Sequence, residues 1–527
     1  MLRDWFYQLS MCAADPDVLR LAPDSFERRL REELTTIVSA DDFTGWYHPT
    51  LGAPSCGPVT MTGMLLLQTR YGLTDGEIVE RARRDLGFRY ALRMDLPDQQ
   101  PPSVSKYRGF RARLYAKKGE DFLHQRVLDR AAGEGLVPDT RLQAQDSSNT
   151  DCRGAQLDTF NLIGAAIGAV IREVARAADR TAADLAAEWQ LARYLARSVK
   201  GQVDIDWSSE DERNKLLTEE IADADRLPEL VAGLGLGLRP AIDQAIALAK
   251  AVARQDVELL DDGTFKIRRG TAKGRIISIT DPEARHGHKT SSKTITGFKH
   301  HVQATLTSLF VTGITITDAA AHDSAASPEL IEQSAAAGVK PDEVVGDQQY
   351  GTGKNIRALA AMGVTVLAKM GRTSSKTCIP KDDFRIDLEK MAVTCPQGHT
   401  TTEHTWIKDP EGSKERVRSF KFPKAVCQQC PMVQLCNNET RQGGRRSIKF
   451  SVYQEEMERK KAFNTTPRAK QVLRSRSAIE RIISHLVRMG LRKARFFGQN
   501  MVQFQAYLTA AAYNLQRIFT LTAPNRM

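Results

Sequence analysis

The chain has 527 residues, of which 41% are hydrophobic and 26% charged, a composition typical of a soluble globular protein with more than one domain. Its 75 Lys and Arg exceed its 64 Asp and Glu, and the resulting charge of +11 suits a polyanionic partner. Eight cysteines are too few for a disulfide scaffold. The longest apolar run, residues 162–171, is about half the length of a membrane span, and the N-terminus lacks the order of a signal peptide. We therefore expect a cytoplasmic protein without a membrane partner.

Residues 1–135 are predicted to form a helical N-terminal domain. The stretch "TMTGMLLLQTRYGLTDGEIVERARRDLGFRYAL" carries apolar residues at helical spacing, with Gly72 as a break and Thr74–Asp75 as a new helix start. A helix, a tight turn and a second helix are compatible with DNA binding, and equally with an ordinary helical bundle. We assign this segment as a DNA-binding domain and keep the bundle as the alternative.

The next segments alternate in character. Residues 136–160 hold a short strand that is predicted to end at Asp146. Residues 161–260 are rich in Ala, Leu, Glu and Arg and are predicted to form several helices. In residues 261–371 the β-type runs "FKIRRG", "GRIISIT", "FKHHVQATL" and "FVTGITIT" precede two helices and two further strands. This alternation predicts a mixed α/β sheet that the helical segment interrupts.

Residues 372–450 are polar and contain four clustered cysteines, whereas residues 451–527 are again predicted to be helical. Thiolates in the pattern of a lone Cys followed by C-x₂-C-x₅-C can bind Zn²⁺ tetrahedrally, and the same order resembles the iron–sulfur site of some nucleases. His399 is a possible substitute ligand, and a reduced cysteine cluster without metal is the alternative. We predict a structural metal site in a Cys-rich insertion, with the ligands Cys395, Cys427, Cys430 and Cys436.

Three acids stand out by their positions. Asp347 follows the β-branched run in "EVVGDQQYG", and Asp146 follows the earlier strand. Glu480 lies on the edge of an apolar helical face, one turn after Arg476. Two of them have an ordinary structural explanation, which is a helix cap for Asp347 and an i,i+4 ion pair for Glu480. The apolar face itself is made by Ile479, Ile482, Ile483 and Leu486.

Together these stretches resemble the DDE transposases of bacterial insertion sequences, whose catalytic domain has the RNase H-like fold. The resemblance is carried by "QDSSNT", "DPEARHGHKTSSKTITGFKHHV", "VVGDQQYG" and "RSRSAIERIISHLVRMGLRKARFFG". It implies that Asp146, Asp347 and Glu480 form a catalytic triad holding two Mg²⁺ or Mn²⁺ ions, which activate the nucleophile and stabilise the leaving oxygen in phosphodiester cleavage. The fold predicted on this basis is an RNase H-like mixed sheet, split by a helical and a Cys-rich insertion and preceded by an all-α domain.

The sequence departs from the family pattern in several places. Gln348 and Gln349 follow the second acid, where a basic or small residue is common. Leu473 and Val487 occupy positions that are often Tyr and Lys in relatives, whereas Arg476 matches the family's Arg.

Two further acids are rivals to Asp347 for the second place in the triad. We rank Asp281 and Asp323 below it because turn chemistry before Pro282 explains the first and helix capping explains the second.

Basic residues concentrate beside the third acid, since residues 441–495 hold 16 Lys and Arg against four Glu. Such clustering favours DNA phosphate contacts, although charge runs are often solvated faces. Lys299 lies near the expected site, where a solvated strand lysine is the alternative to a DNA contact. The predicted DNA-binding residues are Lys299, Arg476, Arg488, Arg492, Lys493 and Arg495.

The resemblance therefore implies an insertion-sequence transposase that cleaves and joins DNA at terminal inverted repeats. Its partners would be double-stranded repeat and target DNA and further copies of the chain, and it would act in the bacterial cytoplasm at the nucleoid. Two alternatives remain, which are an RNase H-like nuclease without strand transfer and a catalytically inactive DNA-binding derivative.

Overall fold

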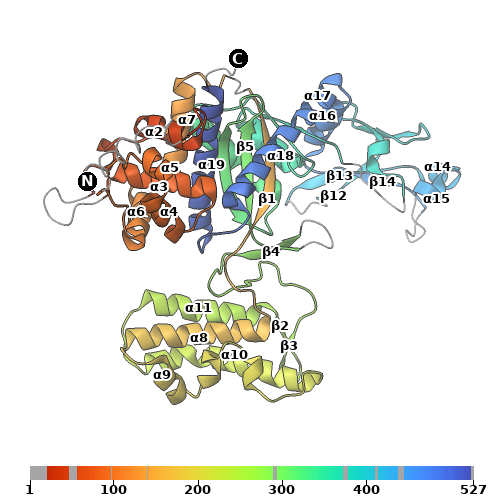
Figure 1. Cartoon of the computed structure of the whole chain (residues 1–527). Helices are drawn as coiled ribbons and strands as arrows, with labels where there is room; N and C mark the ends of the chain where they lie inside the picture. The colour runs from red at the N-terminus through yellow and green to blue at the C-terminus, as the bar shows by residue number, and fades with distance from the viewer. Residues whose placement is uncertain are drawn as a thin grey trace.

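The computed structural model places a mixed sheet between a helical N-terminal domain and a Cys-rich module, with a helical insertion below the sheet (Figure 1). The structure describes residues 20–46, 56–96, 98–138, 141–288, 294–371, 378–409, 414–436 and 444–523. No described helix combines the length and the apolar composition that crossing a membrane requires.

The N-terminal domain is helical, as predicted. The predicted break is confirmed, because the helix before it ends at Gly72 in the left-handed conformation and the next one begins after Thr74. The Thr74 side chain accepts the backbone N–H of Glu77, whose carboxylate accepts the N–H of Thr74 in return. The helices are α2 (Phe26–Ile37), α3 (Pro58–Tyr71), α4 (Asp75–Arg84), α5 (Leu86–Ala91), α6 (Val104–Lys118) and α7 (Phe122–Gly133).

The central sheet has the order β4-β5-β1-β7-β8, and β6 also pairs with β5. β1 runs antiparallel to β5 and parallel to β7, and β7 runs parallel to β8. Its strands are β1 (Leu142–Asp151), β4 (Arg285–His288), β5 (Thr294–Thr305), β6 (Val311–Asp318), β7 (Glu343–Gly346) and β8 (Thr365–Ala368). Two sequence predictions were wrong in detail: β1 continues past Asp146 to Asp151, and residues 274–280 form no strand.

The two faces of the sheet are covered differently. Ala144 of β1 packs in a continuous hydrophobic core with the N-terminal helices and with α18 (Ser477–Leu486) and α19 (Gln499–Leu521). Gln143 and Gln145 point the other way, toward α12 (Ser327–Ala336), where Gln145 accepts a hydrogen bond from Ser327 at 2.7 Å. The alternation along β1 therefore places Asp146 on the face of α18.

The helical insertion is a separate bundle joined to the sheet through two chain crossings (Figure 1). It has its own core, and Gly164 and Gly168 of α8 allow close contact with Val199 and Tyr194. The insertion comprises α8 (Thr159–Ala177), α9 (Ala182–Glu188), α10 (Glu210–Ala232), α11 (Pro240–Gln255), β2 (Val257–Leu259) and β3 (Phe265–Ile267).

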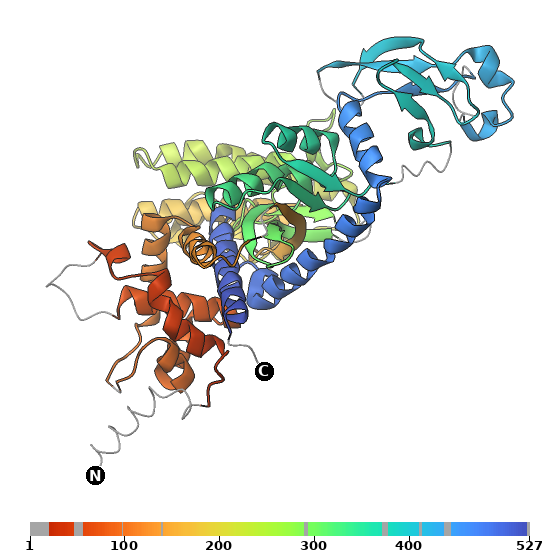
Figure 2. The same cartoon turned by 90° about the horizontal axis from the view of Figure 1, so that it is seen from above.

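The Cys-rich module projects from the body of the molecule (Figure 2). Its small core contains Phe384, Phe420, Phe422 and Phe450. After it, α16 (Gln454–Asn464) and α17 (Pro467–Ser475) lead the chain back to α18. The remaining elements are α13 (Gly353–Ala361), β9 (Arg385–Asp387), β10 (Ala392–Thr394), β11 (Thr400–Thr401), β12 (His404–Lys408), β13 (Arg416–Lys421), α14 (Lys424–Gln428), α15 (Val433–Cys436) and β14 (Ser447–Lys449).

Candidate active site

The first two acids are brought together by strand pairing. β1 and β7 are parallel neighbours in which Ala144 is paired with Val345. Two residues further along each strand, this register places Asp146 beside Asp347, which directly follows β7. Because side chains two positions apart share a face, both carboxylates project on the side that α18 covers.

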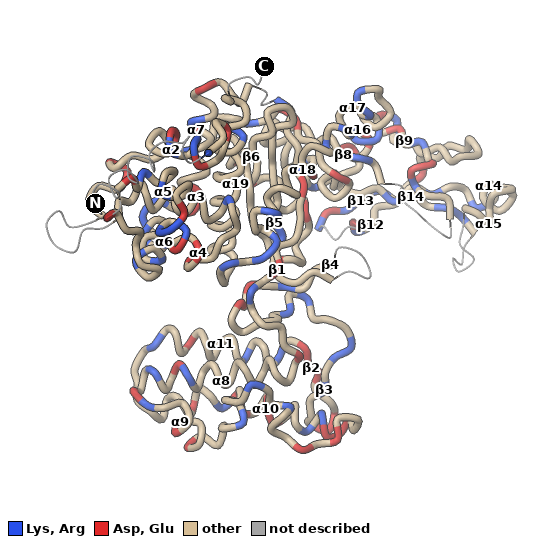
Figure 3. The backbone as a smooth tube through the Cα atoms, in the orientation of Figure 1, with Lys and Arg blue, Asp and Glu red and all other residues tan. Residues whose placement is uncertain are grey.

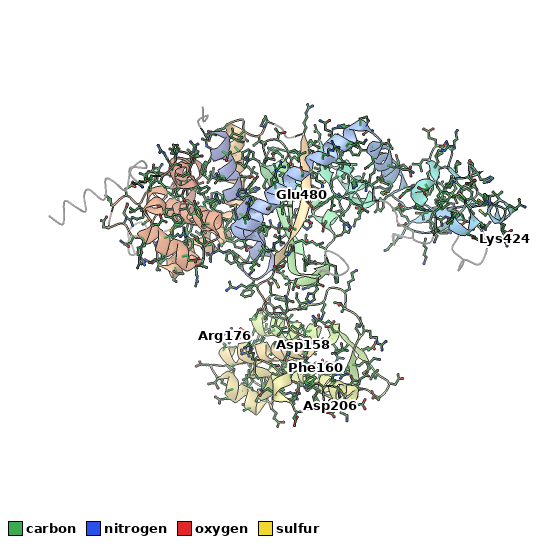
Figure 4. All side chains as sticks on the ribbon, turned by 45° about the vertical axis from the view of Figure 1, so that its right-hand side comes forward. Asp158, Phe160, Arg176, Asp206, Lys424 and Glu480 are labelled. Carbon is green, nitrogen blue, oxygen red and sulfur yellow. The ribbon has the colours of Figure 1, made fainter. Side chains whose placement is uncertain are left out.

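The third acid reaches the same place from α18. The apolar face of this helix is confirmed, since Ile479, Ile482 and Leu486 are buried. Figure 4 labels Glu480 on this helix over the sheet, apart from Asp158 and Phe160 in the insertion. Burial of one face of α18 against the body thus fixes the acid on its edge.

Arg476 links the first and third acids. Its Nη1 donates to Asp146 Oδ2 at 2.9 Å, and its Nη2 donates to Glu480 Oε1 at 2.6 Å. The i,i+4 ion pair expected from the sequence is therefore present, but the same guanidinium also reaches β1. A single planar cation that bridges two carboxylates holds them at one site and compensates their charge.

The environment raises the pKa of Asp146 to about 6. Burial is the main cause, and the neighbouring charges of Asp347 and Glu480 act in the same direction. The backbone N–H of Ser147, at 2.9 Å from Oδ1, and the guanidinium of Arg476 oppose this shift. Three carboxyl groups thus lie close enough to influence one another, and the Arg476 cation contacts two of them.

A second polar group lies on the opposite face of β1. Ser147 donates its hydroxyl hydrogen to Asp323 Oδ2 at 2.7 Å, and Lys299 Nζ lies 2.8 Å from Asp323 Oδ1. The expectation that Asp323 caps a helix was wrong, because His322 caps the 3₁₀ turn η4 (Asp323–Ala326). Lys299 is also not a solvated strand lysine, since it pairs with Asp323 and donates to the carbonyl of Ala321.

Tyr350 is a part of the site that the sequence interpretation missed. Its ring is buried, and its hydroxyl lies 3.3 Å from Nδ1 of His301. Burial and the charges of Asp323, Asp146 and Asp347 raise the pKa of Tyr350 well above its usual value. Gly346 permits this arrangement, because a Cβ there would lie 2.6 Å from Cβ of Tyr350. The glycine before Asp347 and the tyrosine after it were the available signal.

The rival acid Asp281 lies away from the triad. Its side chain is buried, and Oδ1 accepts the backbone N–H of Gly498 at 3.1 Å. Glu283 accepts the N–H of Gln499 at 2.6 Å, so both carboxylates stabilise the first turn of α19. This capping role was not predicted from the sequence.

The predicted basic residues after the third acid divide into two groups. Arg488 and Lys493 are exposed. Arg492 instead contacts Asn149 of β1, and Arg495 donates to the carbonyl of Leu73 at 2.6 Å, beside Asp75 of the N-terminal domain. Part of the basic segment therefore joins domains within the chain.

The four clustered cysteines surround one small cavity of about 30 Å³. Its wall is formed by Phe384, Cys395, His399, Phe422, Val426, Cys427, Cys430, Val433, Cys436 and Arg446. Burial raises the pKa of Cys436, the Arg446 cation lowers it, and the other three thiols raise it further. Nevertheless, within the described ranges no three or more His, Cys, Asp or Glu side chains have the arrangement of a metal site, either here or at the acids.

Comparison with known families gives two matches. A family described as "Transposase DDE domain" matches residues 394–519, and one described as "Transposase domain (DUF772)" matches residues 19–113. These two matches support a DDE transposase of insertion-sequence type. Neither the curated proteins nor the solved structures gave a match.

The matched segments span the cysteines, Glu480 and the basic segment, and separately α2 to the middle of α6. Asp146 and Asp347 lie outside both. The transposase families imply a DNA substrate, and DDE transposase domains generally use divalent metals such as Mg²⁺.

Proposed function

We propose that the transposase cleaves DNA strands and joins them to a target with Asp146, Asp347 and Glu480 as its catalytic triad. The observation that carries this proposal is the convergence of β1, β7 and α18, with Arg476 bonded to two of the acids. Two of the three carboxylates thus share one guanidinium, and the strand register places the third beside Asp146.

An RNase H-like fold for the catalytic domain is part of this proposal. The order β6-β5-β1-β7-β8, with three antiparallel strands followed by two parallel ones, supports it. In this arrangement the first acid belongs to the central strand and the second directly follows its parallel neighbour.

Divalent ions fit the donor set, because hard cations such as Mg²⁺ prefer carboxylate, water and phosphate oxygens. When bound, two such ions would supply Lewis-acid activation of the attacking hydroxyl and the leaving oxygen. Asp146, Asp347 and Glu480 would hold them, and Arg476 would be free to exchange a carboxylate for a DNA phosphate.

DNA contacts outside the acids are proposed for Arg488 and Lys493, whose side chains are exposed beside α18. Internal contacts of Lys299, Arg492 and Arg495 favour a positioning role for these three residues. The N-terminal helical domain would recognise terminal inverted repeats, and paired ends would require an oligomer in the bacterial cytoplasm.

We also propose a structural metal, Zn²⁺ or an iron–sulfur cluster, at Cys395, Cys427, Cys430 and Cys436. The shared cavity of these cysteines supports it, and thiolates suit either metal. Elemental analysis of the purified protein is the test. We expect enough zinc or iron to fill about one metal site per chain. Finding neither metal above background would contradict the proposal.

The main test measures excision and insertion of a marked element by the protein and by Asp347→Asn. Asp342→Asn, an exposed acid before β7, is the matched control. We expect the first variant to bind DNA without cutting it and the control to remain active. Cutting by Asp347→Asn at the parental rate would refute the triad, and cutting without joining by the parent would favour the nuclease alternative.

A further inference from the structure

The pairing of β12 with β13 in the Cys-rich module creates an unusual surface. Trp406 stands opposite Arg418, and Lys408 stands opposite Arg416. Since alternate residues of a strand share a face, these four side chains lie on the same face of the strand pair. We call them the hairpin face.

Trp406 is partly exposed to solvent on this face. Its side chain is 50% exposed, and the Arg418 guanidinium lies over the ring at 4.7 Å from the centroid. Nη2 of Arg416 donates to the Trp406 carbonyl at 3.2 Å, which fixes the backbone beneath the ring. The aromatic surface is therefore presented in a defined orientation rather than buried in the nearby phenylalanine core.

The hairpin face lowers the stability of the module when nothing is bound to it. Like charges directly opposite each other on paired strands are destabilising, and half of a large aromatic ring remains in water. Lys408, Arg416 and Arg418 form no ion pair with any acid in the described ranges. Charge compensation within the module does not explain this arrangement, whereas an anionic partner with a planar group does.

The position of this face is consistent with a role beside the acids. The module projects from the body, and α16 and α17 connect it to α18, which carries Glu480 (Figures 1 and 2). Lys and Arg recur along β12, β13 and β14 (Figure 3). A polyanion bound at α18 could therefore continue along the module.

We infer that the hairpin face binds DNA that contains an unpaired stretch, with Trp406 stacked on an exposed base and Lys408 and Arg416 on flanking phosphates. This inference rests on the proposed function for its choice of DNA as the partner. Paired bases present only their edges in the grooves, so the ring can stack fully only on a base that is unpaired. Phosphate contacts add affinity without sequence preference.

The test uses the full-length protein without divalent metal, so that no strand is cut. Fluorescence anisotropy measures binding to two labelled duplexes of the same sequence, one blunt and one with a single-stranded overhang. For Trp406→Ala we expect about 10-fold weaker binding to the overhang duplex and less than about 2-fold on the blunt one. Trp406→Phe should restore much of the loss because it retains a stacking ring.

The charge contacts are tested with Lys408→Gln and Arg416→Gln. Each should lower the slope of log Kd against log salt concentration by about 1, on either duplex. Lys215→Gln, which removes an exposed cation from the helical insertion, is the matched control and should leave the overhang preference unchanged.

Equal binding by Trp406→Ala and the parent on the overhang duplex would overturn the inference, and so would an equal loss on both duplexes. Unchanged salt slopes for both charge variants would overturn the phosphate contacts. These outcomes are separate from failure of the proposed catalysis, because Asp347→Asn tests cutting, whereas every measurement here is of binding to uncut DNA.

Discussion

Both the sheet and the helical insertion contain a buried carboxyl group, but in opposite surroundings. Asp146 in the sheet is bonded to Arg476 and to the N–H of Ser147, and two further acids lie beside it. Glu220 of α10 is fully buried in the insertion, and neither of its carboxylate oxygens has a hydrogen-bond partner. Burial raises the pKa of Asp146 to about 6 and that of Glu220 to about 9.

The difference shows that a raised pKa alone does not identify a functional acid. Glu220 is neutral at pH 7, and the opposing charges of Arg193 and Lys200 do not reverse the effect of burial. Asp146 is instead surrounded by groups that stabilise its charge and by acids that need a common cation. Convergent partners, rather than the shift, distinguish a site from a buried acid without one.

The largest expected effect is on DNA cleavage, which should depend on Asp146 and not on Glu220. Asp146→Asn removes a carboxylate oxygen of the proposed metal site and should lower strand cleavage by about 10³-fold or more, because a metal ion contributes several kcal/mol to such a transition state. Glu220→Gln, the same exchange of carboxyl for amide, should cut at the parental rate. Cleavage of a labelled repeat duplex measures both, and similar losses in the two variants would remove the distinction.

A second prediction concerns Arg476, because Glu220 has no hydrogen-bonded cation of this kind. Arg476→Met leaves Asp146 and Glu480 without their shared partner and should lower cleavage by about 100-fold. Arg476→Lys keeps the charge but cannot bridge two carboxylates with a planar fork, so an intermediate rate is expected. Cleavage assays with circular dichroism as a folding control provide the measurement; parental rates for Arg476→Met would contradict the bridging role.

The third prediction is a pH dependence of stability. Because folding raises the pKa of Glu220 from 4.5 to about 9, the folded state binds an additional proton between these values. The contribution of this group to stability is fully present below pH 4.5 and is lost as the pH rises toward 9. Glu220→Gln should therefore match the parent near pH 4.5 and be more stable by on the order of 4 kcal/mol at pH 8. Urea unfolding at both pH values measures this difference, and a constant offset would contradict it.

The smallest effect is expected on the far face of β1. Ser147→Ala removes the hydrogen bond to Asp323 but leaves the ion pair of that acid with Lys299. We expect a loss of about 1 kcal/mol in stability and a several-fold lower cleavage rate. Thr150→Ala in the same strand, which loses a bond to the Leu491 carbonyl, is the comparison. A larger activity loss for Thr150→Ala than for Ser147→Ala would exclude a specific role for Ser147.

Local sequence determined several elements of this protein. The glycine and Thr–Asp signals fixed the helix boundary at Gly72, and the spacing of isoleucines fixed the buried face of α18. The β-branched run before Asp347 correctly predicted β7. The spacing of the cysteines correctly indicated that the four thiols lie together, and they line one cavity. Such features depend on residues within a few turns or strand repeats, so a linear pattern suffices to predict them.

Only the tertiary structure decided which side chains meet. The β1–β7 register put Asp146 beside Asp347, and helix packing brought Arg476 to β1 as well as to Glu480. The tertiary structure also pairs Lys299 with Asp323 and places Asp281 where it caps α19. Strand register and helix packing are set by contacts between residues hundreds of positions apart, and no local pattern records them.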